Sequence, residues 1–197
     1  MGPVVERHPF LYFQDGSIVI RADNTLYKVF ASILSDRSQV FRDCFSLPRP
    51  QLHGDGLDDE NPVLLPDSAF DVNNLFHFLF SVRSELALDE EHMASLLQIS
   101  HKYGVQEARD HAINALDTMV QLTPVKRISL ARACEVDYWL EPAFRDLLKG
   151  PLDLTLEEAK LIGITNFYLI SRAKRKADLL RISFALSPPR ILESSSG

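Results

Sequence analysis

The stretch covering residues 15–47 changes its hydrophobic period halfway along, and this change constrains the fold more than any other feature of the sequence. Its first half contains two runs of β-branched and aromatic residues, at 18–20 and 26–30. Between them lie Asp23 and Asn24, which both tolerate the positive φ that a tight hairpin turn requires. The second half places apolar residues three and four positions apart, as on one face of a helix: Val40, Phe41, Cys44 and Phe45. A hairpin that continues directly into apolar helices is expected to bury them against its own sheet.

The segments on either side of this stretch differ sharply in composition. We expect residues 1–9 to be a flexible lead, and the aromatic run at 10–13 to form a short strand before the turn signal Asp15-Gly16. Residues 48–61 combine proline, glycine and acidic side chains with almost nothing to bury. We interpret them as a mobile connector, with an acidic docking loop as the alternative.

Strand and helix patterns continue up to residue 120. Residues 63–65 predict a short buried strand, and the Phe-rich segment after Ser68 predicts a helix that is buried on more than one side. Two amphipathic helices are predicted over 89–103 and 105–119. Together these elements predict an α+β domain at residues 10–120, with a short sheet flanked by helices.

An all-α extension is predicted over residues 121–182, packed on this domain, with a disordered tail at 183–197. Its helices are expected at 124–135, 138–149, 156–162 and 164–181. The last helix would share one apolar face among Phe167, Ile170, Ala173, Ala177 and Leu180. Residues 172–176 form the chain's basic cluster, which we interpret as solvated surface, with a nuclear-import or anion-binding patch as the alternative.

Composition favours an intracellular protein, either cytoplasmic or nuclear. The net charge of −6 over 197 residues gives no footprint for direct nucleic-acid binding. The two cysteines, Cys44 and Cys134, lie in apolar helical patterns without a CxxC motif, as is typical of a reducing compartment. The N-terminus lacks the apolar run of a signal peptide, and no segment reaches membrane-spanning length. We therefore expect no contact with a membrane.

Catalytic signatures are missing from the sequence. The six histidines form no HExxH or Cys/His cluster, and no GxSxG, P-loop or GxGxxG motif occurs. His77 is interpreted as a core or interface histidine and not as a metal ligand. We expect no catalytic, cofactor-binding or metal-binding residues, no cofactor and no enzymatic activity.

The residues after the hairpin resemble the BTB (also called POZ) domain. The resemblance rests on Leu34, Arg37-Ser38, Val40-Phe41-Arg42 and Phe45, and Ser38-x-x-Phe41-x-x-x-Phe45 is its sharpest part. Ser38, Val40, Phe41 and Phe45 would form the core motif of the family. The lead-in Tyr12-Phe13-x-Asp15-Gly16 resembles the fungal branch.

This resemblance implies a non-catalytic protein–protein interaction module that forms a homodimer and acts as an adaptor or scaffold for another protein. In BTB dimers an N-terminal strand often pairs with the partner subunit. The implied dimer interface therefore comprises Phe10, Tyr12, Phe13, Ile33 and Leu34. The alternative is a substrate adaptor of a cullin-based ubiquitin ligase. Cullin-binding members often carry hydrophobic-any-Glu where this chain has Val72-Asn73-Asn74, and the charged pocket of corepressor-binding members is not carried over at Phe30-Ala31.

Overall fold

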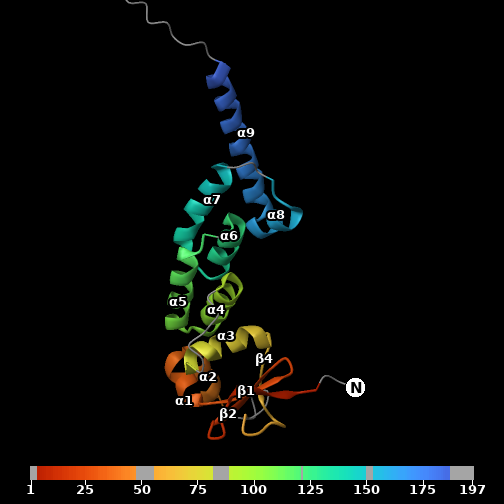
Figure 1. The fold of residues 1–197 in the computed structure, drawn as a ribbon, viewed down its shortest axis with the longest axis vertical. Coiled ribbons are helices and arrows are strands. Elements are labelled where there is room, and N and C mark those ends of the chain that lie inside the picture. Colours follow the sequence, from red (N-terminus) through yellow and green to blue (C-terminus); the bar gives the residue numbers. More distant parts are fainter. Residues whose placement is uncertain (1–3, 48–55, 82–88, 121, 150–152, 187–197) are drawn as a thin grey trace, which may run out of the picture. The chain divides into compact units, whose positions relative to one another are not determined.

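A computed structural model describes the chain at residues 4–47, 56–81, 89–120, 122–149 and 153–186. It divides into two compact units, Met1–Leu122 and Thr123–Gly197, drawn in Figure 1. The first combines a small mixed sheet with helices, and the described part of the second is helical. The α+β fold class predicted from the sequence is confirmed.

The sheet is built on the predicted hairpin. β2 (Ile18–Ala22) and β3 (Thr25–Val29) pair antiparallel, and Asp23 in the turn has a φ of +50°. β1 (Glu6–Tyr12) runs parallel to β3, and β4 (Val63–Leu65) runs parallel to β2. The strand order is β1-β3-β2-β4, so β1 and β4 are the edge strands.

β1 differs from its prediction in two ways. It begins at Glu6 and not at Phe10, so part of the expected flexible lead is a strand. It also pairs with β3 of its own chain, with a shift in register between Arg7 and Tyr12. The amide of Phe13 continues the pairing by donating to the carbonyl of Lys28 over 2.8 Å. β3 therefore occupies one edge of β1, and pairing of its outer edge with a partner subunit stays a prediction.

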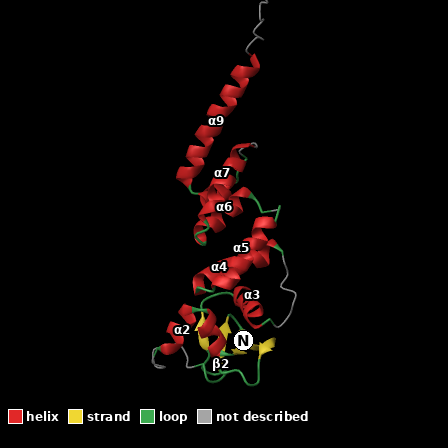
Figure 2. Ribbon diagram, turned by 90° about the vertical axis from the view of Figure 1, so that its left-hand side faces the viewer, coloured by secondary structure: helices red, strands yellow, loops and turns green. Residues whose placement is uncertain are grey.

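Two short helices follow the hairpin, α1 (Ala31–Arg37) and α2 (Gln39–Ser46). α3 (Ala69–Phe80) then lies against one face of the sheet, as Figures 1 and 2 show. The contact centres on Tyr27, whose hydroxyl donates to the carbonyl of Ala69 over 3.1 Å and whose ring lies 5.3 Å from that of Phe76. Of the Phe-rich helix, one side is fully buried, while Phe70 is exposed and residues 77–80 are half-buried.

α4 (Glu90–Tyr103) and α5 (Gln106–Thr118), two consecutive amphipathic helices, complete the first unit. The cap between them is Gly104, whose φ of +64° lies in the left-handed region that favours glycine. Asp89 begins α4 by accepting a hydrogen bond from the amide of His92. Both helices thus begin and end close to the predicted positions.

The second unit has a core of its own. It contains α6 (Pro124–Ala133), a 3-10 helix η2 (Asp137–Trp139), α7 (Leu140–Lys149), α8 (Leu156–Ile162) and α9 (Ile164–Leu186). Its core consists of Val125, Ile128, Ala143, Leu147, Ile162 and Ile170. α8 begins with the predicted capping box, and α9 continues to residue 186, past the expected start of the tail. The rest of that tail lies outside the described residues.

Candidate functional site

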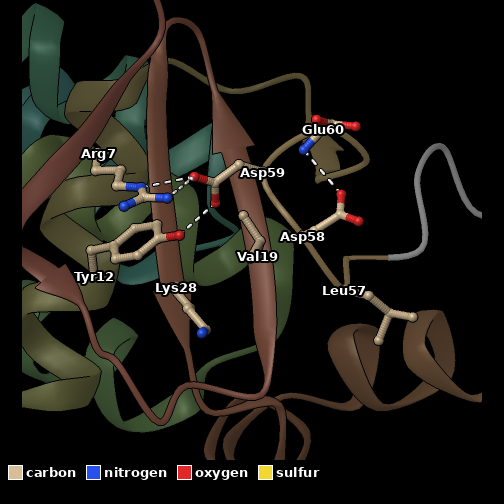
Figure 3. Close-up of a pocket in the computed structure, with 8 residues that line it drawn as sticks. All are labelled: Arg7, Tyr12, Val19, Lys28, Leu57, Asp58, Asp59 and Glu60. Carbon is tan, nitrogen blue, oxygen red and sulfur yellow. Dashed lines mark hydrogen bonds and ion pairs between the residues drawn. The ribbon is translucent and has the colours of Figure 1, made fainter.

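An ionic cluster on the sheet face opposite α3 ties β1 to the loop before β4 (Figure 3). Nε and Nη2 of Arg7 each lie 2.7 Å from Oδ2 of Asp59. The hydroxyl of Tyr12 donates to Oδ1 of the same carboxylate over 2.5 Å. The Arg7 guanidinium also lies 4.6 Å from the centre of the Tyr12 ring. One carboxylate therefore holds residues from both ends of β1.

The electrostatics of the cluster favour this arrangement. Burial alone would raise the pKa of Asp59, but hydrogen bonds from Tyr12 and Arg7, together with the charge of Arg7, hold it below its ordinary value. Burial and the adjacent carboxylate raise the pKa of Tyr12, so its hydroxyl stays protonated and continues to donate. The cluster is thus charged as an ion pair at neutral pH.

The loop that carries Asp59 is itself anchored. The carbonyl of Gly56 accepts a hydrogen bond from the amide of Val19 in β2 over 2.8 Å. Gly56 has a φ of +69°, and a Cβ there would lie 2.7 Å from Cγ1 of Ile18, so only glycine fits this close approach. Oδ1 of Asp58 accepts from the amides of Glu60 and Asn61. Residues 56–61 are therefore not the mobile connector predicted, and residues 48–55 lie outside the described chain.

Beside the cluster lies an open pocket of about 450 Å³. It is lined by residues of both charges and a few apolar ones: Arg7, Tyr12, Val19, Lys28, Leu57, Asp58, Asp59 and Glu60. The ammonium of Lys28 donates to the carbonyl of Gln14 over 2.9 Å, so it too serves the local structure. Within the described ranges, no three His, Cys, Asp or Glu side chains gather where they could hold a metal ion. The pocket offers hydrogen bonds and charge for recognition.

On the other face of the sheet, β1 is fixed by His8. Its ring stacks on Tyr27 with the centres 5.2 Å apart, and His77 of α3 lies 5.7 Å away. Nδ1 accepts hydrogen bonds from the amides of Phe10 and Leu11, at 3.2 and 3.0 Å, which requires the neutral ring. Burial and the nearby His77 lower the pKa of His8. The placement of His77 beside another ring agrees with the interpretation of a packed histidine.

The five residues of the predicted dimer interface are not equivalent. Phe10 is 45% exposed, and Ile33 is half-buried on α1. Tyr12 is bound to Asp59, and Phe13 stacks on Phe30 with the ring centres 5.4 Å apart. Leu34 has no exposed surface. Leu34 therefore belongs to the core of its own chain and not to a surface for a partner.

The family motif mainly organises the contact between α2 and α4. Ser38 is buried; its hydroxyl accepts from the amide of Phe41 and donates to the carbonyl of Tyr103 over 2.5 Å. The Phe41 ring is 1% exposed and stacks on Tyr103 at 4.6 Å, with Phe45 half-buried on its other side at 5.7 Å. Phe41 is thus buried, with ring contacts to Tyr103 of α4 and to Phe45, and its packing beneath the hairpin stays a prediction. Val40 is 43% exposed, so it is not a core residue.

The α3 segment compared with cullin-binding proteins faces inward. Val72 and Asn74 are both buried, and the Asn74 amide donates to the hydroxyl of Ser95 over 2.9 Å. That hydroxyl donates in turn to Asp71 over 2.5 Å. The position where the family comparison expects a glutamate is thus part of a contact between α3 and α4.

Sequence reasoning missed Arg7, His8 and Asp59, because it assigned them to a flexible lead and a connector. Arg7 and Asp59 are 52 positions apart, and no local period reports such a pair. The three consecutive polar residues 6–8 do not alternate with apolar ones, so no strand period marked the start of β1 ahead of the aromatic run.

The comparisons with known proteins agree with this architecture. A search of curated proteins finds no match to the chain. Residues 13–119, more than half of the chain, match the BTB/POZ domain family. This range contains the hairpin, the Ser38 motif and the helices α1 to α5. Members of this family are non-catalytic modules for protein–protein interaction. The chain therefore belongs to the BTB/POZ domain family.

Proposed function

We propose that this protein acts as a homodimeric adaptor or scaffold without catalytic activity, and that its BTB/POZ domain forms the dimer. The observation that supports this is the exposed edge of the sheet at β1. Phe10 is 45% exposed in this strand, and Val4 and Val5, which directly precede it, are exposed as well. An edge strand with apolar side chains is a liability unless another surface covers it.

A second copy related by a two-fold axis covers such an edge efficiently, since each subunit presents the same strand to the other. β1 is held to its own sheet on both faces, by Asp59 on one and by His8 on the other. In the proposed dimer the outer edge of β1 therefore contacts the outer edge of the partner's β1, and each strand stays in its own sheet. Phe10, Tyr12, Phe13 and Ile33 remain proposed contact residues, and Leu34 is omitted because it is buried.

Multi-angle light scattering at tens of micromolar tests this proposal, with an expected mass of twice 22.3 kDa. Phe10→Lys should lower the dimer fraction because it places a charge at the apolar edge. The Phe10 amide, which donates to His8, is unchanged by this substitution. Phe70→Lys is the matched control, since Phe70 is similarly exposed but lies on α3. A wild-type chain that stays monomeric at about 200 μM would contradict the proposal, as would equal effects of the two variants.

The alternative function, a substrate adaptor of a cullin-based ubiquitin ligase, draws no support from α3. Val72 and Asn74 are buried in the chain's own core, so neither offers surface to a cullin. A pull-down with a purified cullin N-terminal region separates the two functions. Retention of the cullin at tens of micromolar would favour the adaptor alternative.

We also propose an intracellular location, cytoplasmic or nuclear, and a place in the fungal branch of the family. The position of Cys44 and Cys134 in helical patterns without a CxxC motif supports the first, and the lead-in at residues 12–16 supports the second. Among the described residues, no helix has both the length and the apolar character needed to cross a bilayer. Imaging of a fluorescent fusion tests the location, and a phylogeny of homologous sequences tests the branch.

A further inference from the structure

The C-terminal helix α9 carries a groove that its own unit leaves open. In Figure 1 the second half of α9 extends past α7 and α8 of the same unit. The groove has a volume of about 560 Å³. It is shallow because all of its lining residues lie on one face of α9, and they include one carboxylate beside two cations: Phe167, Ser171, Lys174, Arg175, Asp178, Leu179 and Ile182. The predicted apolar face of this helix is covered only at its start, where Ile170 is buried and Phe167 is partly buried.

The groove is apolar at its far end and positively charged around it. Leu179 and Ile182 are 61% and 55% exposed. The side chain of Lys174 lines the groove and is held in place there. Its ammonium donates to the carbonyl of Leu148 over 3.3 Å and lies 3.2 Å from Asp178. Residues 172–182 contain five cationic side chains and one carboxylate, a net charge of +4 in a chain whose net charge is −6.

We propose that this groove binds an acidic amphipathic helix of another protein. The apolar ridge of such a helix would lie on Leu179 and Ile182, and its carboxylates would pair with Arg175 and the neighbouring Arg172. Helix-in-groove recognition uses anchors spaced three and four residues apart, which matches the spacing of the groove residues. The proposal concerns the second unit and does not depend on dimer formation by the BTB/POZ domain.

The same observations argue against two other occupants. A second copy of α9 would place two segments of net charge +4 against each other, and like charges repel across a close interface. An anionic membrane requires one continuous apolar face on the helix. Here Arg175 lies between the apolar positions of the groove, and the exposed Leu180 is about 100° around the helix from Leu179.

Fluorescence anisotropy with the full chain tests the proposal. The probe is a labelled synthetic helix with leucines at three- and four-residue spacing and glutamates on both flanks. We expect a micromolar Kd that rises with salt, and no binding when lysines replace the glutamates. Arg175→Glu should weaken binding at least tenfold. Arg181→Glu, with the same charge change about 120° around α9, should weaken it less than threefold. Arg175→Gln replaces the reversal if the Trp139 fluorescence melt shows that Arg175→Glu is unfolded.

Three results would overturn the proposal. The first is no binding of the acidic helix at about 200 μM. The second is an equal loss in the variants at positions 175 and 181, since net charge alone would then explain the attraction. The third is stronger binding to anionic lipid vesicles than to the acidic helix, which would identify a membrane as the occupant.

Discussion

Replacing Phe41 by alanine should unfold the BTB/POZ domain far more easily than the same replacement at its neighbour Val40. The Phe41 ring is 1% exposed and stacked between Tyr103 and Phe45, so its removal leaves a cavity between α2 and α4. Truncation of a buried phenylalanine costs about 3–5 kcal/mol. At about 2–4 °C per kcal/mol for a chain of this size, Tm should fall by about 6–20 °C.

Val40→Ala is the matched control within the same helix. Val40 is 43% exposed, and alanine is the better helix former, so the change should stay within about 0.5 kcal/mol. Thermal melts followed by far-UV circular dichroism, at one fixed protein concentration, measure both variants. Equal Tm values for the two variants would refute the assignment of Phe41 to the core and of Val40 to the surface.

Three further predictions follow from the same contacts. Asp59→Asn should accelerate amide hydrogen exchange in residues 6–12, because Arg7 loses its ion pair and the asparagine keeps only one acceptor oxygen for Arg7 and Tyr12, whereas the neighbouring Glu60→Gln should not. His8 has a lowered pKa in the folded state. The unfolded chain therefore binds the proton of His8 more tightly than the folded chain does. The stability that neutral His8 contributes is full above about pH 6.5, and it is lost as the pH falls through the lowered pKa of the folded state. His8→Gln should reduce the drop in Tm between pH 7.5 and 5.5, and an unchanged drop would contradict this. Trp139, the single tryptophan, lies in the second unit and reports on its unfolding. The sequence predicts that the helical extension depends on the BTB/POZ domain, so Phe41→Ala should also shift the Trp139 fluorescence transition. An unshifted transition would show that the extension folds on its own.

The sequence predicted those features that local chemistry determines. Asp23 takes the left-handed conformation of the hairpin turn, and Thr155 and Glu158 form the capping box, since each depends on residues only a few positions apart. The face of α2 was predicted too broadly. Val40 lies about 100° around the helix from Phe41, and the contact with Tyr103 covers Phe41 but leaves Val40 43% exposed.

The candidate site could not be predicted in the same way, because it joins segments that have no common pattern. Asp59 lies in an acidic stretch whose composition predicts a loop. Its contacts with β1 depend on Gly56, which anchors that loop on β2. Arg7 likewise resembles any exposed residue of a chain terminus. Their pairing depends on the parallel placement of β1 beside β3, which sequence periodicity does not encode.

The anchoring of β1 limits how this BTB/POZ domain can associate. A strand that is exchanged with a partner must first leave its own sheet, and here that would break the Arg7 and Tyr12 bonds to Asp59 and the stacking of His8 on Tyr27. It would also expose Leu11, which is completely buried. Association through the outer edge of β1 requires none of these losses, and it covers Phe10 where the side chain already lies. The contacts of β1 within its own chain therefore favour a dimer of intact subunits over one with exchanged strands.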